Sequence, residues 1–80
     1  MTAEEANKLT MWYQIPVQIR EKIEEKVKSG IPCVTFYKTV TPEVFKSLYY
    51  VDWLKHLGYK VEIENLLDLD DTKLFISWKI

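Results

Sequence analysis

The stretch KLFISWKI (residues 73–80) decides the fold. Leu74, Ile76 and Trp78 lie at alternate positions, which is the period of a β-strand. Phe75 gives the opposite face a large apolar side chain as well. A short run that is apolar on both faces is typical of a buried strand. We therefore expect residues 73–80 to form the central strand of a sheet.

Two other segments have the composition of strands and can flank this central strand. IPCVTFYKTV (residues 31–40) is rich in β-branched and aromatic residues. YKVEIE (residues 59–64) places Val61 and Ile63 on one face and charged side chains on the other. With residues 73–80 between them, the three strands have the order 1-3-2 and the sheet is mainly antiparallel. The order 1-2-3, with a parallel first pair, also satisfies the right-handed crossover rule.

Three segments carry helix signals. TAEEANKLT (residues 2–10) offers Thr2 as an N-cap, with Glu5 at capping-box spacing. PVQIREKIEEKVKSG (residues 16–30) repeats apolar residues every fourth position, and MWYQIP before it predicts a break. PEVFKSLYYVDWLKHLGY supplies the third helix, over residues 42–57. The element order α-α-β-α-β-β predicts an α+β fold with the three helices packed on one face of the sheet.

Length and composition indicate one small folded domain, residues 1–80. The chain is 48% hydrophobic and 14% aromatic, which is too apolar for a disordered chain. A chain of this length buries only about 60–65% of its unfolded surface. The core is therefore small, and self-association would add to its stability.

Several classes of protein are disfavoured by charge and sequence pattern. The net charge of -1 and the pI of about 5.8 argue against a nucleic-acid binder, which usually has a basic face. No apolar run approaches the roughly 18–20 residues that a membrane span needs, and the polar start MTAEEANKLT does not resemble a signal peptide. The single cysteine, Cys33, excludes an internal disulfide and fits a reducing compartment. We expect a cytoplasmic protein.

The chain offers little catalytic or metal-binding chemistry. His56 is the single histidine, and nothing local marks it or Cys33 as an activated pair. One Cys and one His cannot build a structural zinc site. DLDDT (residues 68–72) lacks the glycine and distal glutamate of a calcium loop, so we expect a polar hairpin turn there. We predict no catalytic residues, no metal and no cofactor, and hence a protein that is not an enzyme.

The third predicted helix carries more large side chains than one buried face can hold. At 100° per residue one side carries good core candidates: Ser47, Tyr50, Val51, Leu54 and Leu57. The opposite side carries Phe45, Tyr49 and Trp53 in a row spaced i, i+4, i+8. One helix lying on one sheet cannot bury both sides.

This aromatic row has two interpretations. In the first, the two preceding helices cover the row and close a single core. In the second, part of the row stays exposed and binds a partner protein or a second copy, because aromatic residues are enriched at interface hot spots. The predicted partner-binding residues are Phe45, Tyr49 and Trp53, with Trp12 and Tyr13 as neighbours.

TAEEANKLT, LKHLGYKVEIE and LFISWK resemble parts of small proteins that are common in tailed bacteriophages and prophages. Those proteins open with a T-A-x-E-A helix and end in a GY-x-V…ISW hairpin, as residues 2–10, 58–63 and 76–78 do. The resemblance leaves residues 11–50 largely unmatched. It implies a viral origin and an α+β fold, and it carries over no activity and no functional residues.

Three functions follow as hypotheses. The first is a non-enzymatic phage-type protein that acts by contact with another protein, such as a host factor, in the host cytoplasm. The second is a minor virion structural or assembly component. The third is a small nucleic-acid-binding protein, against which the acidic residues of the 59–72 region argue.

Overall fold

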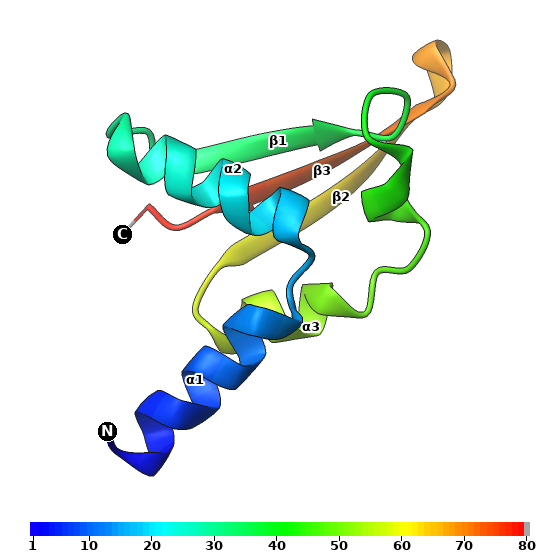
Figure 1. The fold of residues 1–80 in the computed structure, drawn as a ribbon. Coiled ribbons are helices and arrows are strands. Elements are labelled where there is room, and N and C mark those ends of the chain that lie inside the picture. The colour runs from blue at the N-terminus through cyan, green and yellow to red at the C-terminus, as the bar shows by residue number, and fades with distance from the viewer. Residues whose placement is uncertain (80) are drawn as a thin grey trace.

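The computed structural model describes residues 1–79 as an α+β domain (Figure 1). Three α-helices, three strands and two 3₁₀ turns follow one another in the predicted order α-α-β-α-β-β. The elements are α1 (Ala3–Gln14), α2 (Val17–Lys28), β1 (Cys33–Tyr37), η1 (Pro42–Phe45), α3 (Tyr50–His56), β2 (Lys60–Leu66), η2 (Leu67–Leu69) and β3 (Asp71–Ser77).

The C-terminal strand lies in the middle of the sheet, as its two apolar faces predict. The strand order is β1-β3-β2, and both pairs are antiparallel. Ile76 of β3 lies opposite Val34 on one side and Val61 on the other. Leu74 and Ile76 are completely buried, so the core is built on β3.

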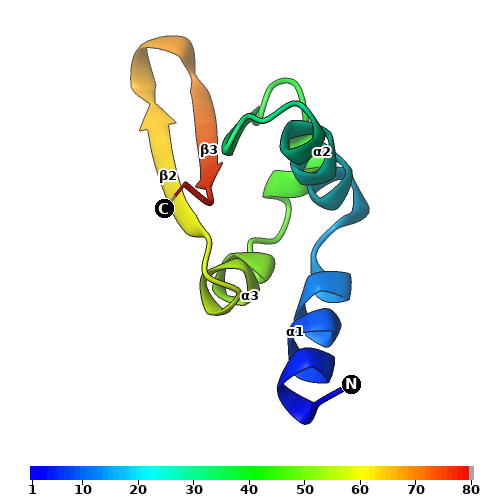
Figure 2. The ribbon, with the colours of Figure 1, turned by 90° about the vertical axis from the view of Figure 1, so that its left-hand side faces the viewer.

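The helices form one layer on one face of the sheet, and the other face is open (Figure 2). α2 contacts β1, and α3 contacts β2. α1 contacts α3 and extends away from the sheet, which gives the molecule a long axis of 47 Å (Figure 1). The core between the layers consists of Ile15, Ile19, Ile23, Val34, Phe36, Val44, Tyr50, Leu54, Leu74 and Ile76.

The first helix is longer than the sequence predicts. Thr2 caps it, and the Thr2 hydroxyl accepts a hydrogen bond of 3.1 Å from the Glu5 N–H, as the capping-box spacing indicates. The helix then continues through residues 11–14, where we expected a break. The break comes at Ile15, whose extended backbone (ψ 137°) is the conformation that a following proline imposes.

The third predicted helix is divided in two. Residues 42–45 form a 3₁₀ turn, residues 46–49 are irregular, and α3 proper is the short segment from Tyr50 to His56. In one straight helix Val44 would point about 80° or more away from Tyr50 and Leu54. The irregular segment lets all three side chains enter the same core, where each is at most 2% exposed. Burial of Val44 therefore outweighs continuity of the helix.

One core candidate of the third predicted helix is wrong. Ser47 lies in the irregular segment and is exposed. In the second helix, the buried part of the fourfold apolar repeat is Ile19 and Ile23, which pack with Ile15, and Val27 is exposed.

Candidate functional site

The candidate site lies where α1 meets α2 and α3, at the end of the molecule opposite the β2–β3 hairpin (Figure 1). α1 is a helix of 12 residues, and none of them is buried. Residues 1–10 are all exposed. Most of this helix therefore faces solvent, and its C-terminal turn fixes it to the body.

Two of the predicted partner-binding residues are exposed at this C-terminal turn. Tyr13 is 65% exposed, and the guanidinium carbon of Arg20 lies 5.2 Å from the centre of its ring. Tyr49 is 54% exposed, and its hydroxyl donates a hydrogen bond of 3.2 Å to the Gln14 carbonyl. Its ring meets the buried Tyr50 edge-on, with 5.9 Å between ring centres. Both tyrosines are thus oriented by the protein while much of each side chain faces water.

Leu9 extends this exposed area along α1. Leu9 precedes Tyr13 by four residues, so the two side chains share one face of the helix. Leu9 is 41% exposed. We call Leu9, Tyr13 and Tyr49 the α1 surface. Arg20 borders it through its contact with Tyr13 and also donates a hydrogen bond of 3.0 Å to the Ile15 carbonyl.

The other three predicted residues have a different role. Trp12, Phe45 and Trp53 are half-buried and pack against the core. Phe45 does not continue the predicted row, because it lies in η1 and the irregular segment separates it from Tyr49 and Trp53 at α3. Of the five predicted residues, the structure leaves Tyr13 and Tyr49 open for contact.

Tyr59, supported by Trp78, holds α1 in place, and neither residue is among the predicted partner-binding residues. The Trp12 ring stacks on Tyr59, with 6.4 Å between centres and 18° between planes. Tyr59 in turn meets Trp78 edge-on at 5.9 Å. Burial raises the pKa of the Tyr59 hydroxyl above its ordinary value. The GY and ISW positions of the sequence thus anchor the N-terminal helix to the end of the sheet.

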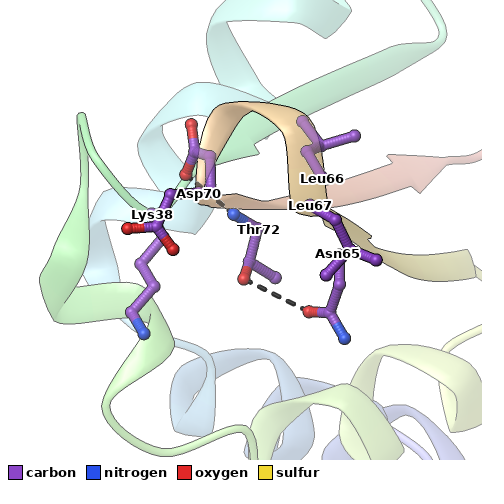
Figure 3. Close-up of a pocket in the computed structure, with 7 residues that line it drawn as sticks. Lys38, Asn65, Leu66, Leu67, Asp70 and Thr72 are labelled. Carbon is purple, nitrogen blue, oxygen red and sulfur yellow. Dashed lines mark hydrogen bonds between the residues drawn. The ribbon is translucent and has the colours of Figure 1, made fainter.

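The hairpin turn at the other end of the molecule contains a small open pocket (Figure 3). Its volume is about 180 Å³, and it is lined by Lys38, Asn65, Leu66, Leu67, Asp70, Asp71 and Thr72. The Asp71 carboxylate accepts hydrogen bonds from the Thr39 N–H (3.1 Å), the Thr39 hydroxyl (2.9 Å) and the Thr72 N–H (2.8 Å).

These hydrogen bonds give Asp71 a structural role. Partial desolvation acts to raise its pKa, but the hydrogen bonds from Thr39 and Thr72 outweigh it and hold the pKa below its ordinary value. The carboxylate therefore joins the loop after β1 to the start of β3. The hairpin turn predicted at residues 68–72 is formed by residues 67–70, with Asp70 in the left-handed conformation (φ 49°), and Asp71 and Thr72 already belong to β3. Within residues 1–79, no three His, Cys, Asp or Glu side chains are grouped so that they could hold a metal ion.

The two residues considered for nucleophilic chemistry lie on separate elements. Cys33 is the first residue of β1 and is half-buried. His56 is the last residue of α3 and is exposed.

In the described part of the chain no helix has the length and apolar character required to cross a bilayer.

Comparisons with known proteins gave no match: no family model fits the chain, and neither a curated protein nor a solved structure is similar to it. The resemblance to small phage proteins therefore stays a prediction.

Proposed function

We propose that the protein is a non-enzymatic binding protein that contacts another protein through the α1 surface. One observation carries this proposal. No residue of the 12-residue helix α1 is fully buried, and two tyrosines that are more than half exposed lie at its C-terminal turn. A partner that covers Leu9, Tyr13 and Tyr49 would complete the packing that the single chain lacks.

The physical basis is the weakness of short helices. Helices shorter than about 12–15 residues are marginal in water unless they pack on something. α1 packs at its C-terminal turn, through Trp12 on Tyr59 and through the Tyr49 hydroxyl on Gln14. Its first two turns are stabilised by the Thr2 cap and by an exposed Glu4–Lys8 pair at 3.6 Å, which contributes little. Binding to a partner would supply the missing apolar contact.

The composition of the α1 surface suits a protein partner. Tyrosine contributes a large contact area for a small loss of side-chain entropy, and tyrosine and arginine are enriched at interface hot spots. Tyr13, Tyr49 and the adjoining Arg20 provide both residue types. The resemblance to phage proteins supports a host protein as the partner and the host cytoplasm as the compartment. A virion component would use the same surface with a viral partner.

Site-specific photo-crosslinking tests the proposal. A photoreactive phenylalanine analogue replaces Tyr13 or Tyr49, and the protein is irradiated in the cells in which it is naturally produced. We expect one discrete heavier adduct from each position, containing the same partner. Leu67 is the matched control, because it is 89% exposed but lies in the distant hairpin turn, and we expect no adduct from it.

A variant at Leu9 tests whether formation of the crosslinked adduct depends on the α1 surface. Leu9→Lys places a charge on the α1 surface at an exposed position one turn from Tyr13, so we expect the adduct yield at Tyr13 to fall at least about tenfold while the fold is kept. Trp53 is unsuitable for this purpose, because it is half-buried against the core and a charge there would unfold the protein. Equal labelling at positions 13, 49 and 67, or a yield unaffected by Leu9→Lys, would contradict the proposal.

A further inference from the structure

We propose that two copies of the chain associate through the free edge of β1 and the adjacent flank of α2, which joins their sheets into one antiparallel sheet across a two-fold axis. This inference goes beyond the proposed function, since it concerns a different surface and a different partner. It rests on three features: the uncharged edge of β1, the direction of its backbone groups, and the order of charges along α2.

The two edges of the sheet differ in charge. The strand order β1-β3-β2 leaves both β1 and β2 at an edge. The β2 edge carries Lys60, Glu62 and Glu64, and charged side chains of this kind protect an edge from pairing with another strand. β1 has the sequence CVTFY and carries no charge. The β1 edge therefore lacks the side chains that would prevent strand addition.

Backbone groups of β1 point outwards at this edge. The Lys38 N–H donates to the Thr72 carbonyl and the Trp78 N–H donates to the Pro32 carbonyl, both at 2.9 Å. Because the direction alternates along an antiparallel strand, the N–H and C=O groups of Cys33 and Thr35 point away from β3. An antiparallel second copy can pair its Thr35 with Cys33 of the first, and by symmetry the reverse pair forms as well.

The flank of α2 on the β1 side has a self-complementary charge pattern. Grooves between α2 and β1 are lined on the helix side by Gln18 and by the charged residues Glu21, Lys22, Glu25 and Lys26, so this flank faces the free edge. Arg20 lies on the opposite flank, where it contacts Tyr13.

A two-fold axis reverses the direction of the second helix. In the register that places Glu21 opposite Lys26 of the second copy, Lys22 lies opposite Glu25, so both of these pairs join opposite charges. Within one chain Lys22 and Glu25 already form an exposed pair at 3.4 Å, which shows that these side chains are available on the surface. The charges therefore favour a second copy of this chain in the antiparallel orientation as the occupant of this edge.

The dimer leaves the α1 surface free. β1 and α1 lie on different sides of the molecule (Figure 1), so pairing at the β1 edge does not cover Tyr13 or Tyr49. The assembly would present two copies of that surface. A partner with two matching sites would then bind with increased avidity.

Complementary charge variants provide the test, with the purified chain alone in sedimentation velocity. We expect the wild type to form a dimer. The variant Lys22→Glu/Lys26→Glu is acidic along the whole flank, and Glu21→Lys/Glu25→Lys is basic along it. We expect each variant alone to dimerise at least about tenfold more weakly, and an equimolar mixture of the two to form the heterodimer.

A pair of proline variants tests the strand contact. Thr35→Pro removes an N–H that points away from β3, so we expect the monomer to stay folded by circular dichroism while the dimer is lost. Asn65→Pro is the matched control: the same alternation points the Asn65 N–H away from β3 at the other edge, so the dimer should persist. If Thr35→Pro does not fold, the charge variants decide the question alone.

Three results would overturn the inference: a wild type that stays monomeric at about 100 µM, a mixture of the charge variants that stays monomeric, or a folded Thr35→Pro variant that dimerises like the wild type. Each of these results leaves the proposed function untouched, because the test contains no other protein. Conversely, failure of the crosslinking at Tyr13 and Tyr49 would leave the dimer untouched.

Discussion

Replacing Leu74 by alanine is expected to lower the free energy of unfolding by about 2–5 kcal/mol. Leu74 is completely buried at the centre of β3, with Phe36 opposite it on β1 and Ile63 opposite it on β2. The substitution leaves a cavity at the point where both strand pairs meet. Since a domain usually has about 5–15 kcal/mol of stability in total, this loss would be a large part of it.

Urea denaturation followed by circular dichroism measures this loss. The matched control is Leu67→Ala, because Leu67 is the same residue type but 89% exposed in the hairpin turn. The control should stay within about 0.5 kcal/mol of the wild type. A Leu74→Ala variant as stable as Leu67→Ala would show that β3 is not the centre of the core.

The second large loss of stability is expected from the substitution Tyr50→Phe. Tyr50 is completely buried, and its hydroxyl donates a hydrogen bond of 2.6 Å to the Val44 carbonyl. This bond joins the first residue of α3 to the η1 turn across the irregular segment 46–49. The substitution leaves a carbonyl without its donor, so we expect a loss of about 1–3 kcal/mol at pH 8.

Tyr50 also predicts how stability depends on pH. Burial, with a smaller contribution from Tyr49, raises the pKa of Tyr50 from 10.0 to about 12. Between these values the unfolded chain has released the proton and the folded chain keeps it, so stability is fully present below pH 10 and falls as the pH rises towards 12. A rise in pKa of this size lowers the free energy of unfolding by about 2–3 kcal/mol once the pH is well above 12.

Urea unfolding midpoints measured at pH 8, 10 and 11 separate the contribution of the Tyr50 hydroxyl to pH-dependent stability from that of other groups. The wild type should lose stability between pH 10 and 11 more steeply than Tyr50→Phe, which lacks the ionisable hydroxyl. Tyr13→Phe, at an exposed position, should behave like the wild type. Equal alkaline losses in the wild type and in Tyr50→Phe would contradict the assignment of a buried, hydrogen-bonded hydroxyl to Tyr50.

Most of the fold could be predicted from local patterns. The two apolar faces of the last strand placed it at the centre of the sheet, and the strand order follows from that choice. Thr2 fixed the start of α1 through a rule that depends on neighbouring residues alone, and Pro16 ends the helix at Ile15 by a similar rule, although the break was expected earlier. Such signals can be read from a sequence because they depend on adjacent residues and not on contacts with distant parts of the chain.

The division of the third helix could not be predicted in this way. Residues 42–57 satisfy the signals for a single helix, with a cap and a proline at the start. The break depends on Val44, Tyr50 and Leu54 sharing one core, and that requirement arises from tertiary packing.

The candidate site was predicted in part. An excess of aromatic side chains indicated an exposed surface, and Tyr13 and Tyr49 are exposed. The row was wrong at Phe45, since its continuation to Tyr49 and Trp53 assumed a continuous helix. Tyr59 was missed because its stacking on Trp12 joins residues far apart in the sequence, for which a single sequence carries no signal.

Amide hydrogen exchange on the purified protein tests most directly whether α1 is left uncovered by the rest of the chain. No side chain of α1 is buried, so we expect the amides of residues 4–9 to exchange at least about 100-fold faster than those of Leu74 and Ile76 in the central strand. Protection of residues 4–9 equal to that of Leu74 and Ile76 would mean that α1 is already packed in the purified protein, and the α1 surface would then not be free for a partner.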